Sequence, residues 1–136
     1  MRRLVLVDTG PVYAAVDPDD QLHARAQHEL KRLARDRRQV VLVYPTLLEA
    51  YTLVLYRLGN RSASQWLQEI TAGAALINPD PVDYRAAWRR VLELADQPVT
   101  LFDATVAVMA TRLRAEIWTY DHHFDILRAP VWRPEA

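Results

Sequence analysis

The chain has 136 residues and a mass of 15.7 kDa, a length that suits one compact domain. Hydrophobic residues make up 51% of it and charged residues 25%, which is typical of a globular protein and argues against disorder. The absence of cysteine excludes disulfide frameworks, thiolate zinc sites and cysteine nucleophiles. Seventeen lysines and arginines balance seventeen acids, so the chain is no polycation, and Lys31 is the only lysine.

Two apolar stretches need to be compared with targeting and membrane segments. The first, residues 4–7, ends at Asp8 and is too short for a signal peptide. The second, residues 40–56, falls short of the roughly 20 residues that a membrane span requires. It also contains Pro45 and Glu49. We therefore expect a cytoplasmic protein that does not enter the membrane.

Short apolar runs alternate with segments of helical periodicity along the chain. In chain order we predict a strand at 3–7, helices at 9–16 and 19–37, a strand at 39–44, helices at 45–58 and from 60 or 62 to 71, a strand at 74–78, helices at 81–95 and 101–114, a strand at 116–119, a helical turn at 124–127 and a strand at 130–132. This alternation predicts a three-layer α/β/α fold with a central parallel sheet, in a single domain covering 1–136. Ligands of such folds bind beyond the carboxyl ends of the strands.

Three acids occupy positions where a ligand site is expected, and each has a structural alternative. Asp8 follows the first predicted strand and is also suited to cap the helix that comes next. Asp103 lies in the first turn of the 101–114 helix, where it completes a capping box with Thr100. Asp121 follows the fourth strand and is placed to cap the turn that contains Phe124.

Glu49 is the most unusual acid in the sequence. It is the only charged residue between Arg38 and Arg57, within the most apolar part of the chain. Burial of an unpaired carboxylate costs several kcal/mol, so Glu49 needs a salt bridge to an arginine of another helix or a bound cation. Helical spacing places it on a stripe of polar residues: Thr46, Thr52 and Tyr56.

A cluster of these four carboxylates would repel itself unless a multivalent cation held it together. Oxygen ligands without cysteine favour Mg²⁺ or Mn²⁺ over zinc. Ions held in this way commonly promote reactions of phosphates. The hydroxyls of Thr9 and Thr119 are suited to hydrogen-bond the carboxylates or an attacking water.

The ordered set of these motifs resembles the PIN domain, and most closely the VapC-type ribonuclease toxins. The matching segments are Val7-Asp8-Thr9-Gly10, Glu49 on the third helix, Leu101-Phe102-Asp103-Ala104 and Thr119-Tyr120-Asp121-His122-His123-Phe124. The resemblance implies about five parallel strands in the order 3-2-1-4-5 and endonucleolytic cleavage of RNA. It also implies one or two Mg²⁺ or Mn²⁺ ions. By residue-wise matching it assigns metal binding to Asp8, Glu49, Asp103 and Asp121, and the family's two hydroxyl positions to Thr9 and Thr119.

The chain departs from the family pattern at a few positions. Thr100 stands where the family often has serine. Asp125 is an additional acid that either reaches a second metal or lies solvated on the last helical turn. His122 and His123 occupy variable positions, and we expect them to be exposed at the rim of the site. Arginines of helices 81–95 and 101–114 are candidates for phosphate contacts.

The resemblance also implies partners: an RNA substrate, a cognate antitoxin that covers the acidic pocket, and a second copy of the chain. Residues 51–58 and Trp66 are candidates for the homodimer interface. One alternative is a phosphatase of the haloacid dehalogenase type, although Gly10 stands where that family has its second aspartate. The other alternative is a PIN-like module that binds RNA or protein without turnover. If cations neutralise the four acids, thirteen others face seventeen basic residues, which leaves a modest positive excess.

Overall fold

The computed structural model describes residues 3–134. Its helices and strands, in chain order, are β1 Leu4–Val7, α1 Thr9–Val16, α2 His23–Arg35, β2 Gln39–Val43, α3 Tyr44–Leu58, α4 Asn60–Gly73, β3 Ala75–Ile77, α5 Pro81–Glu93, α6 Leu101–Leu113, β4 Glu116–Trp118 and α7 His123–Ile126. Each corresponds to a predicted element, with ends that differ by a few residues.

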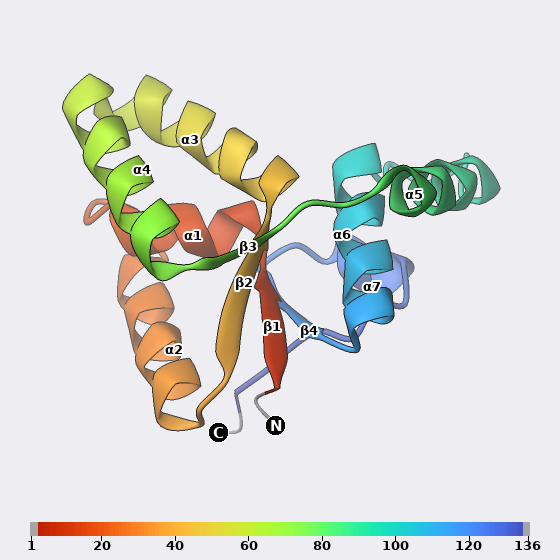
Figure 1. Ribbon diagram of the computed structural model, residues 1–136, viewed down its shortest axis with the longest axis horizontal. Coiled ribbons are helices and arrows are strands. Elements are labelled where there is room, and N and C mark those ends of the chain that lie inside the picture. Colours follow the sequence, from red (N-terminus) through yellow and green to blue (C-terminus); the bar gives the residue numbers. More distant parts are fainter. Residues whose placement is uncertain (1–2, 135–136) are drawn as a thin grey trace.

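The four strands form one parallel sheet in the order β3-β2-β1-β4 (Figure 1). The predicted order is confirmed for these strands, but the predicted fifth strand is reduced to one bridge between Val131 and Ile117. Ile117 donates its N–H to the carbonyl of Pro130 and accepts from Trp132 N–H, both at 2.8 Å. The prolines at 130 and 134 have no N–H to donate, so this segment cannot form a longer ladder.

The sheet separates two layers of helices, with α1 to α4 on one face and α5 to α7 on the other (Figure 1). Successive side chains of a strand point to opposite faces, so Val5 and Val7 pack against the first layer while Leu6 packs against the second. β2 alternates in the same way, with Leu42 on the first side and Val41 on the second. Both faces are therefore covered, which confirms the predicted three-layer α/β/α architecture.

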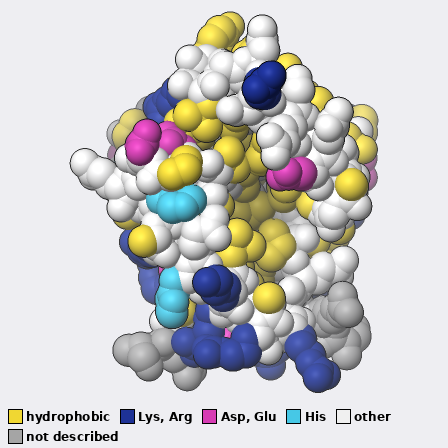
Figure 2. All heavy atoms as spheres, turned by 90° about the vertical axis from the view of Figure 1, so that its left-hand side faces the viewer, with side chains coloured by type: hydrophobic (Ala, Val, Ile, Leu, Met, Phe, Trp, Pro, Cys, Tyr) yellow, Lys and Arg dark blue, Asp and Glu magenta, His cyan; other side chains and the backbone are white. Residues whose placement is uncertain are grey.

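An apolar hollow of about 560 Å³ opens between α2 and α4 on the outer side of the first layer. Leu30 and Leu33 of α2 line one wall, and Trp66 and Ile70 of α4 line the other. Figure 2 shows it as the yellow depression in the middle of that face. Trp66 is 6% exposed and belongs to the core, so it offers little surface for a dimer interface. None of the helices within residues 3–134 is long and apolar enough to span a membrane.

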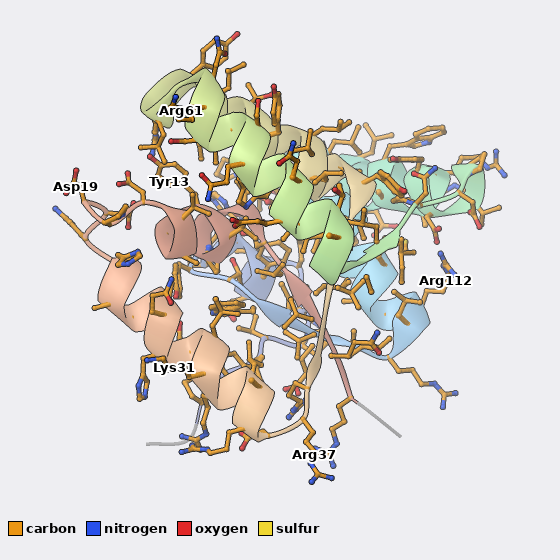
Figure 3. The ribbon with its side chains drawn as sticks, turned by 60° about the vertical axis from the view of Figure 1, so that its left-hand side comes forward. Tyr13, Asp19, Lys31, Arg37, Arg61 and Arg112 are labelled. Atoms are coloured by element: carbon orange, nitrogen blue, oxygen red, sulfur yellow. The ribbon has the colours of Figure 1, made fainter. Side chains whose placement is uncertain are left out.

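α2 is shorter at its start than predicted, because the acids before it hold a loop. Asp17 accepts a hydrogen bond from the N–H of Asp19 at 2.9 Å, and Asp20 accepts one from Leu22 at 2.8 Å. Such side-chain bonds to a nearby backbone compete with helix formation. Figure 3 shows Asp19 and Arg37 beyond opposite ends of α2, an arrangement of charge that suits the helix dipole.

Candidate active site

The four predicted acids come from four different elements that meet at the carboxyl end of β1 and β4. Asp8 directly follows β1, and Asp121 lies three residues after the end of β4. Asp103 is in the first turn of α6, and Glu49 is in the second turn of α3. This is the edge of the sheet at which parallel α/β folds bind their ligands.

Asp8 is 6% exposed and is held by β4. Its backbone N–H donates to the carbonyl of Trp118 at 2.9 Å, and its Oδ2 accepts from the hydroxyl of Thr119 at 2.8 Å. Asp8 is the residue immediately before α1, but its side chain makes no capping hydrogen bond to that helix. The predicted capping role of Asp8 is therefore not observed. Burial raises the pKa of Asp8 to about 6 despite the hydrogen bond from Thr119, and the negative charges of Asp103 and Asp121 act in the same direction.

Asp103 and Asp121 are joined through a histidine. The Nδ1 atom of His123 lies 3.0 Å from Asp121 Oδ1 and 3.7 Å from Asp103 Oδ2. Asp103 is buried, and this burial raises its pKa, with a further contribution from the charge of Asp121. The hydroxyl of Thr100 caps α6 by accepting a hydrogen bond from the Asp103 N–H at 3.0 Å. This bond holds the backbone of Asp103 in place at the start of the helix.

Asp121 also has the predicted local role, because its Oδ1 accepts from the N–H of His123 at 2.9 Å. This turn is the reason that His123 folds back over the acids, while its neighbour His122 remains mostly exposed. The expectation that both histidines are exposed is therefore wrong for His123. The two imidazole rings lie 4.5 Å apart and both approach Asp121, but only His123 also approaches Asp103, a difference that spacing in the sequence does not predict.

Glu49 is exposed, which corrects the prediction that its carboxylate is buried. The buried face of α3 consists of Thr46, Leu47, Ala50 and Val54, and residue 49 lies beside that face. No lysine or arginine of residues 3–134 lies within ion-pair distance of Glu49, so the predicted alternative of a salt bridge is not realised. Partial burial raises the pKa of Glu49 although the nearby hydroxyl of Thr9 acts to lower it, and the charge of Asp103 adds to the rise.

The two threonines named from sequence are both in this cluster. Thr119 Oγ1 donates to Asp8 Oδ2 and accepts from the N–H of Asp121 at 2.9 Å, so one hydroxyl links two of the acids. Thr9 is 7% exposed, and its hydroxyl makes no well-formed hydrogen bond within residues 3–134, although it lies close enough to Glu49 to favour the ionised carboxylate. An unsatisfied buried hydroxyl is costly in a protein interior, so this one is suited to a ligand.

Two other buried acids of the chain show how an acid is neutralised when its role is structural. Asp83 receives two hydrogen bonds from Arg112, at 2.8 and 2.9 Å. Burial tends to raise the pKa of Asp83, but the Arg112 guanidinium holds it below its usual range. Glu29 lies 3.5 Å from Arg25. Among the described residues, none of the four acids of the cluster forms an ion pair with an arginine or lysine. Their basic neighbours within ion-pair distance are histidines.

No protein-family model and no curated protein matches the sequence, whereas solved structures match the fold over nearly the whole chain. The structure of VapC20 from Mycobacterium tuberculosis, a sarcin-ricin loop cleaving toxin, is 20% identical and superposes with a TM-score of 0.82, covering 96% of this chain and 99% of that one. VapBC2 from Rickettsia felis, bound to a promoter DNA fragment, is 15% identical with a TM-score of 0.74, covering 94% and 96%. FitAcB from Neisseria gonorrhoeae is 18% identical with a TM-score of 0.70, covering 95% and 96%.

The chain has the PIN fold. The predicted resemblance is therefore confirmed at the level of architecture, and the assignment of the four acids to a metal site stays a prediction. Within this PIN fold the donors that converge are carboxylate and hydroxyl oxygens, to which His122 and His123 add imidazole nitrogens beside Asp121. Hard oxygen donors of this kind fit Mg²⁺ or Mn²⁺, and the unpartnered Thr9 hydroxyl fits a water or phosphate oxygen beside the ion.

Other charged residues of the chain lie outside this cluster. Asp125 is exposed and pairs with Arg133 at 3.3 Å, which favours the solvated alternative over a role at a second metal. Arg112 is bound to Asp83, so it is removed from the candidates for phosphate contacts. The sequence analysis did not identify Glu29 as a buried acid. Its helical spacing from Ala26 and Leu33 places all three residues on the buried face of α2, and that spacing could have predicted its burial.

Proposed function

We propose that this chain is a metal-dependent endoribonuclease that hydrolyses RNA phosphodiester bonds. The observation that carries the proposal is the set of four acids, drawn from four elements, that have no arginine or lysine partner among the described residues. Burial, with a smaller contribution from the charges of Asp103 and Asp121, raises the pKa of Asp8 to about 6, a cost to the fold that a bound cation would offset. Sites that retain such a cost are commonly functional.

In this proposal Asp8, Glu49, Asp103 and Asp121 hold one or two Mg²⁺ ions, with Mn²⁺ as a substitute. A cation bound there supplies Lewis-acid activation of a water and stabilisation of the leaving oxygen. Thr119 orients Asp8 and the backbone of Asp121 through its two hydrogen bonds. His123 keeps Asp121 and Asp103 at a set separation, and the Thr9 hydroxyl donates to a phosphate oxygen or to the attacking water.

RNA is the favoured substrate because the protein with TM-score 0.82 is described as a toxin that cleaves the sarcin-ricin loop. Charge supports the same substrate: with the four acids neutralised, seventeen basic residues face thirteen acids. We place the activity in the cytoplasm, where RNA is available.

We further propose that the chain is the toxin of a toxin–antitoxin pair. The VapBC2 and FitAcB structures support a cognate antitoxin as a partner. A homodimer is also part of the proposal, because α3 exposes large apolar side chains, with Leu48 at 67% and Tyr56 at 82% exposure. Apolar residues exposed at this level on one helix favour association with another surface.

The deciding experiment is an RNA cleavage assay with Mg²⁺, Mn²⁺ or EDTA. It compares the wild type with Asp103→Asn and with the matched control Asp96→Asn, an exposed acid outside the cluster. We expect cleavage that EDTA abolishes, a loss of about 100-fold or more in Asp103→Asn, and no change in the control. Cleavage that survives EDTA contradicts the proposal. RNA binding without cleavage would favour a binding module, and turnover of small phosphate monoesters alone would favour a phosphatase.

A further inference from the structure

A second cavity, of about 720 Å³, lies beside the acid cluster. The two share a wall, because Thr119, Asp121 and His122 also line this cavity. The opposite wall is one face of α2, where Arg25, His28 and Arg32 follow helical spacing. Nothing in the proposed cleavage reaction uses this cavity.

Its most unusual feature is Glu29, which is 4% exposed. Glu29 Oε1 accepts from the indole N–H of Trp118 at 3.1 Å and from the hydroxyl of Tyr120 at 2.5 Å. It also lies 3.5 Å from Nε of Arg25. A buried carboxylate is tolerated when it is bound in this way, and here it connects the middle of α2 to the segment that carries Thr119 and Asp121.

Arg25 is held at the mouth of the cavity by the same residues. Its guanidinium carbon lies 4.4 Å from the centre of the Tyr120 ring, while its side chain remains 56% exposed. The contact with the Tyr120 ring and the contact of Nε with Glu29 restrict the side chain, which lines the cavity and remains accessible. Arginine in this state offers a planar pair of donors, the geometry that matches a phosphate.

The tryptophans and the tyrosine around the cavity do not offer free faces on which a base can stack. Trp118 and Trp132 are 2% and 5% exposed and pack edge to face against each other, with 6.1 Å between ring centres. The Tyr120 ring is covered by Arg25. The exposed aromatic rings that line this cavity are therefore the imidazoles of His28 and His122, and its guanidinium groups supply the donors for a phosphate.

We propose that this cavity binds the sugar–phosphate backbone of an RNA strand next to the bond that is cut, with Arg25 contacting a phosphate and Glu29 and Tyr120 positioning Arg25. The inference rests on the proposed ribonuclease function and extends it to one specific contact. Because the cavity and the acid cluster share the wall at residues 119–122, a strand lying in one continues into the other.

The test measures binding of a labelled single-stranded RNA oligonucleotide in EDTA over a range of salt concentrations, so that cleavage does not interfere. It compares the wild type with Arg25→Gln and with the control Arg61→Gln, which makes the same change in charge at an exposed position at the start of α4 (Figure 3). We expect Arg25→Gln to bind about tenfold more weakly at ~0.1 M salt, with a slope of log affinity against log salt reduced by about 0.7. Arg61→Gln should remain within about twofold of the wild type.

A third variant, Arg25→Lys, separates charge from geometry. Lysine keeps the charge but loses the planar fork, so we expect the salt slope to return while only part of the affinity does. In cleavage assays with Mg²⁺, the KM of Arg25→Gln should rise by a factor similar to its loss of binding.

The inference is overturned if the wild type binds and cuts RNA and the Arg25→Gln variant binds it with the same affinity and the same salt dependence. It is also overturned if Arg25→Gln weakens only the binding of an acidic protein partner. A wild type that neither binds nor cuts RNA refutes the proposed function, and the inference with it.

Discussion

The prediction that follows most directly from the acid cluster is that Asp8→Asn stabilises the metal-free protein at neutral pH. In the folded chain the pKa of Asp8 is raised from 3.8 to about 6, chiefly by burial. Roughly two pKa units at ~1.4 kcal/mol each give about 3 kcal/mol. Asparagine carries no charge and keeps an oxygen that accepts from Thr119. The variant should therefore avoid this cost.

The sign of the pH dependence follows from the direction of the shift. A carboxyl whose pKa is raised by folding favours the folded state most while it is protonated, below the unfolded value of 3.8. That contribution is lost as the pH rises through about 6. The advantage of Asp8→Asn should accordingly be small near pH 4, about 0.5 kcal/mol, and complete by pH 7.5.

The assay is urea and thermal unfolding in EDTA at both pH values. A gain of 3 kcal/mol corresponds to an increase of roughly 10 °C in melting temperature for a chain of this size. Asp83→Asn is the opposite control, because Asp83 is bound to Arg112 and its pKa is lowered, so that variant should be destabilised at pH 7.5.

Mg²⁺ adds a second readout to the same samples. At a concentration of ~100 times its Kd, an ion that binds only the folded state stabilises it by about 2.7 kcal/mol. The wild type should gain this stability and Asp8→Asn should gain much less. The stability advantage of Asp8→Asn that is expected in EDTA should therefore shrink or reverse in Mg²⁺. The reasoning is refuted if Asp8→Asn is no more stable than the wild type at pH 7.5 in EDTA, or if its advantage is the same at pH 4.

Three further predictions test other parts of the site. Glu49→Gln should change the free energy of unfolding by less than ~0.5 kcal/mol, since residue 49 is exposed, but should weaken Mg²⁺ binding measured by calorimetric titration. Unchanged Mg²⁺ binding would show that Glu49 is not a ligand. Thr9→Val should stabilise the fold by about 1 kcal/mol in urea, because it removes an unsatisfied buried hydroxyl, and should slow cleavage; a destabilised variant would mean that the hydroxyl is satisfied. Tyr56→Lys should convert a homodimer to monomer in light scattering, with Asp96→Asn as the control, and an unchanged mass would place the interface elsewhere.

Features that depend on neighbouring residues in the sequence were predicted well. The short apolar runs became β1 and β2, and the helix after Thr100 begins at Leu101 as expected. Asp8 lies at the end of β1 because Leu4–Val7 is a buried run that the charge interrupts. These signals are local, since strand periodicity, helix capping and the effect of proline depend on a few consecutive residues.

Predictions that depend on which face of an element packs were less successful. Glu49 was expected to be buried because its surroundings are apolar, yet α3 turns a different face to the core. The last strand was expected from an apolar segment, but its prolines leave only the bridge at Val131. His123 was expected to be exposed, and the turn made by Asp121 brings it back onto the acids.

The order of the elements and the place of each of the four acids along them were readable from the amino-acid sequence alone, while the role of these acids as a site stays a prediction. The folded chain decided which oxygens meet: Thr119 donates to Asp8 across 111 residues, and Tyr120 donates to Glu29 across 91. It also decided which acids are neutralised by arginine, as Asp83 is, and which have no arginine or lysine partner among the described residues. The reason is physical, because burial and contacts between distant residues set the energy of a charge, and neither exists before the layers pack.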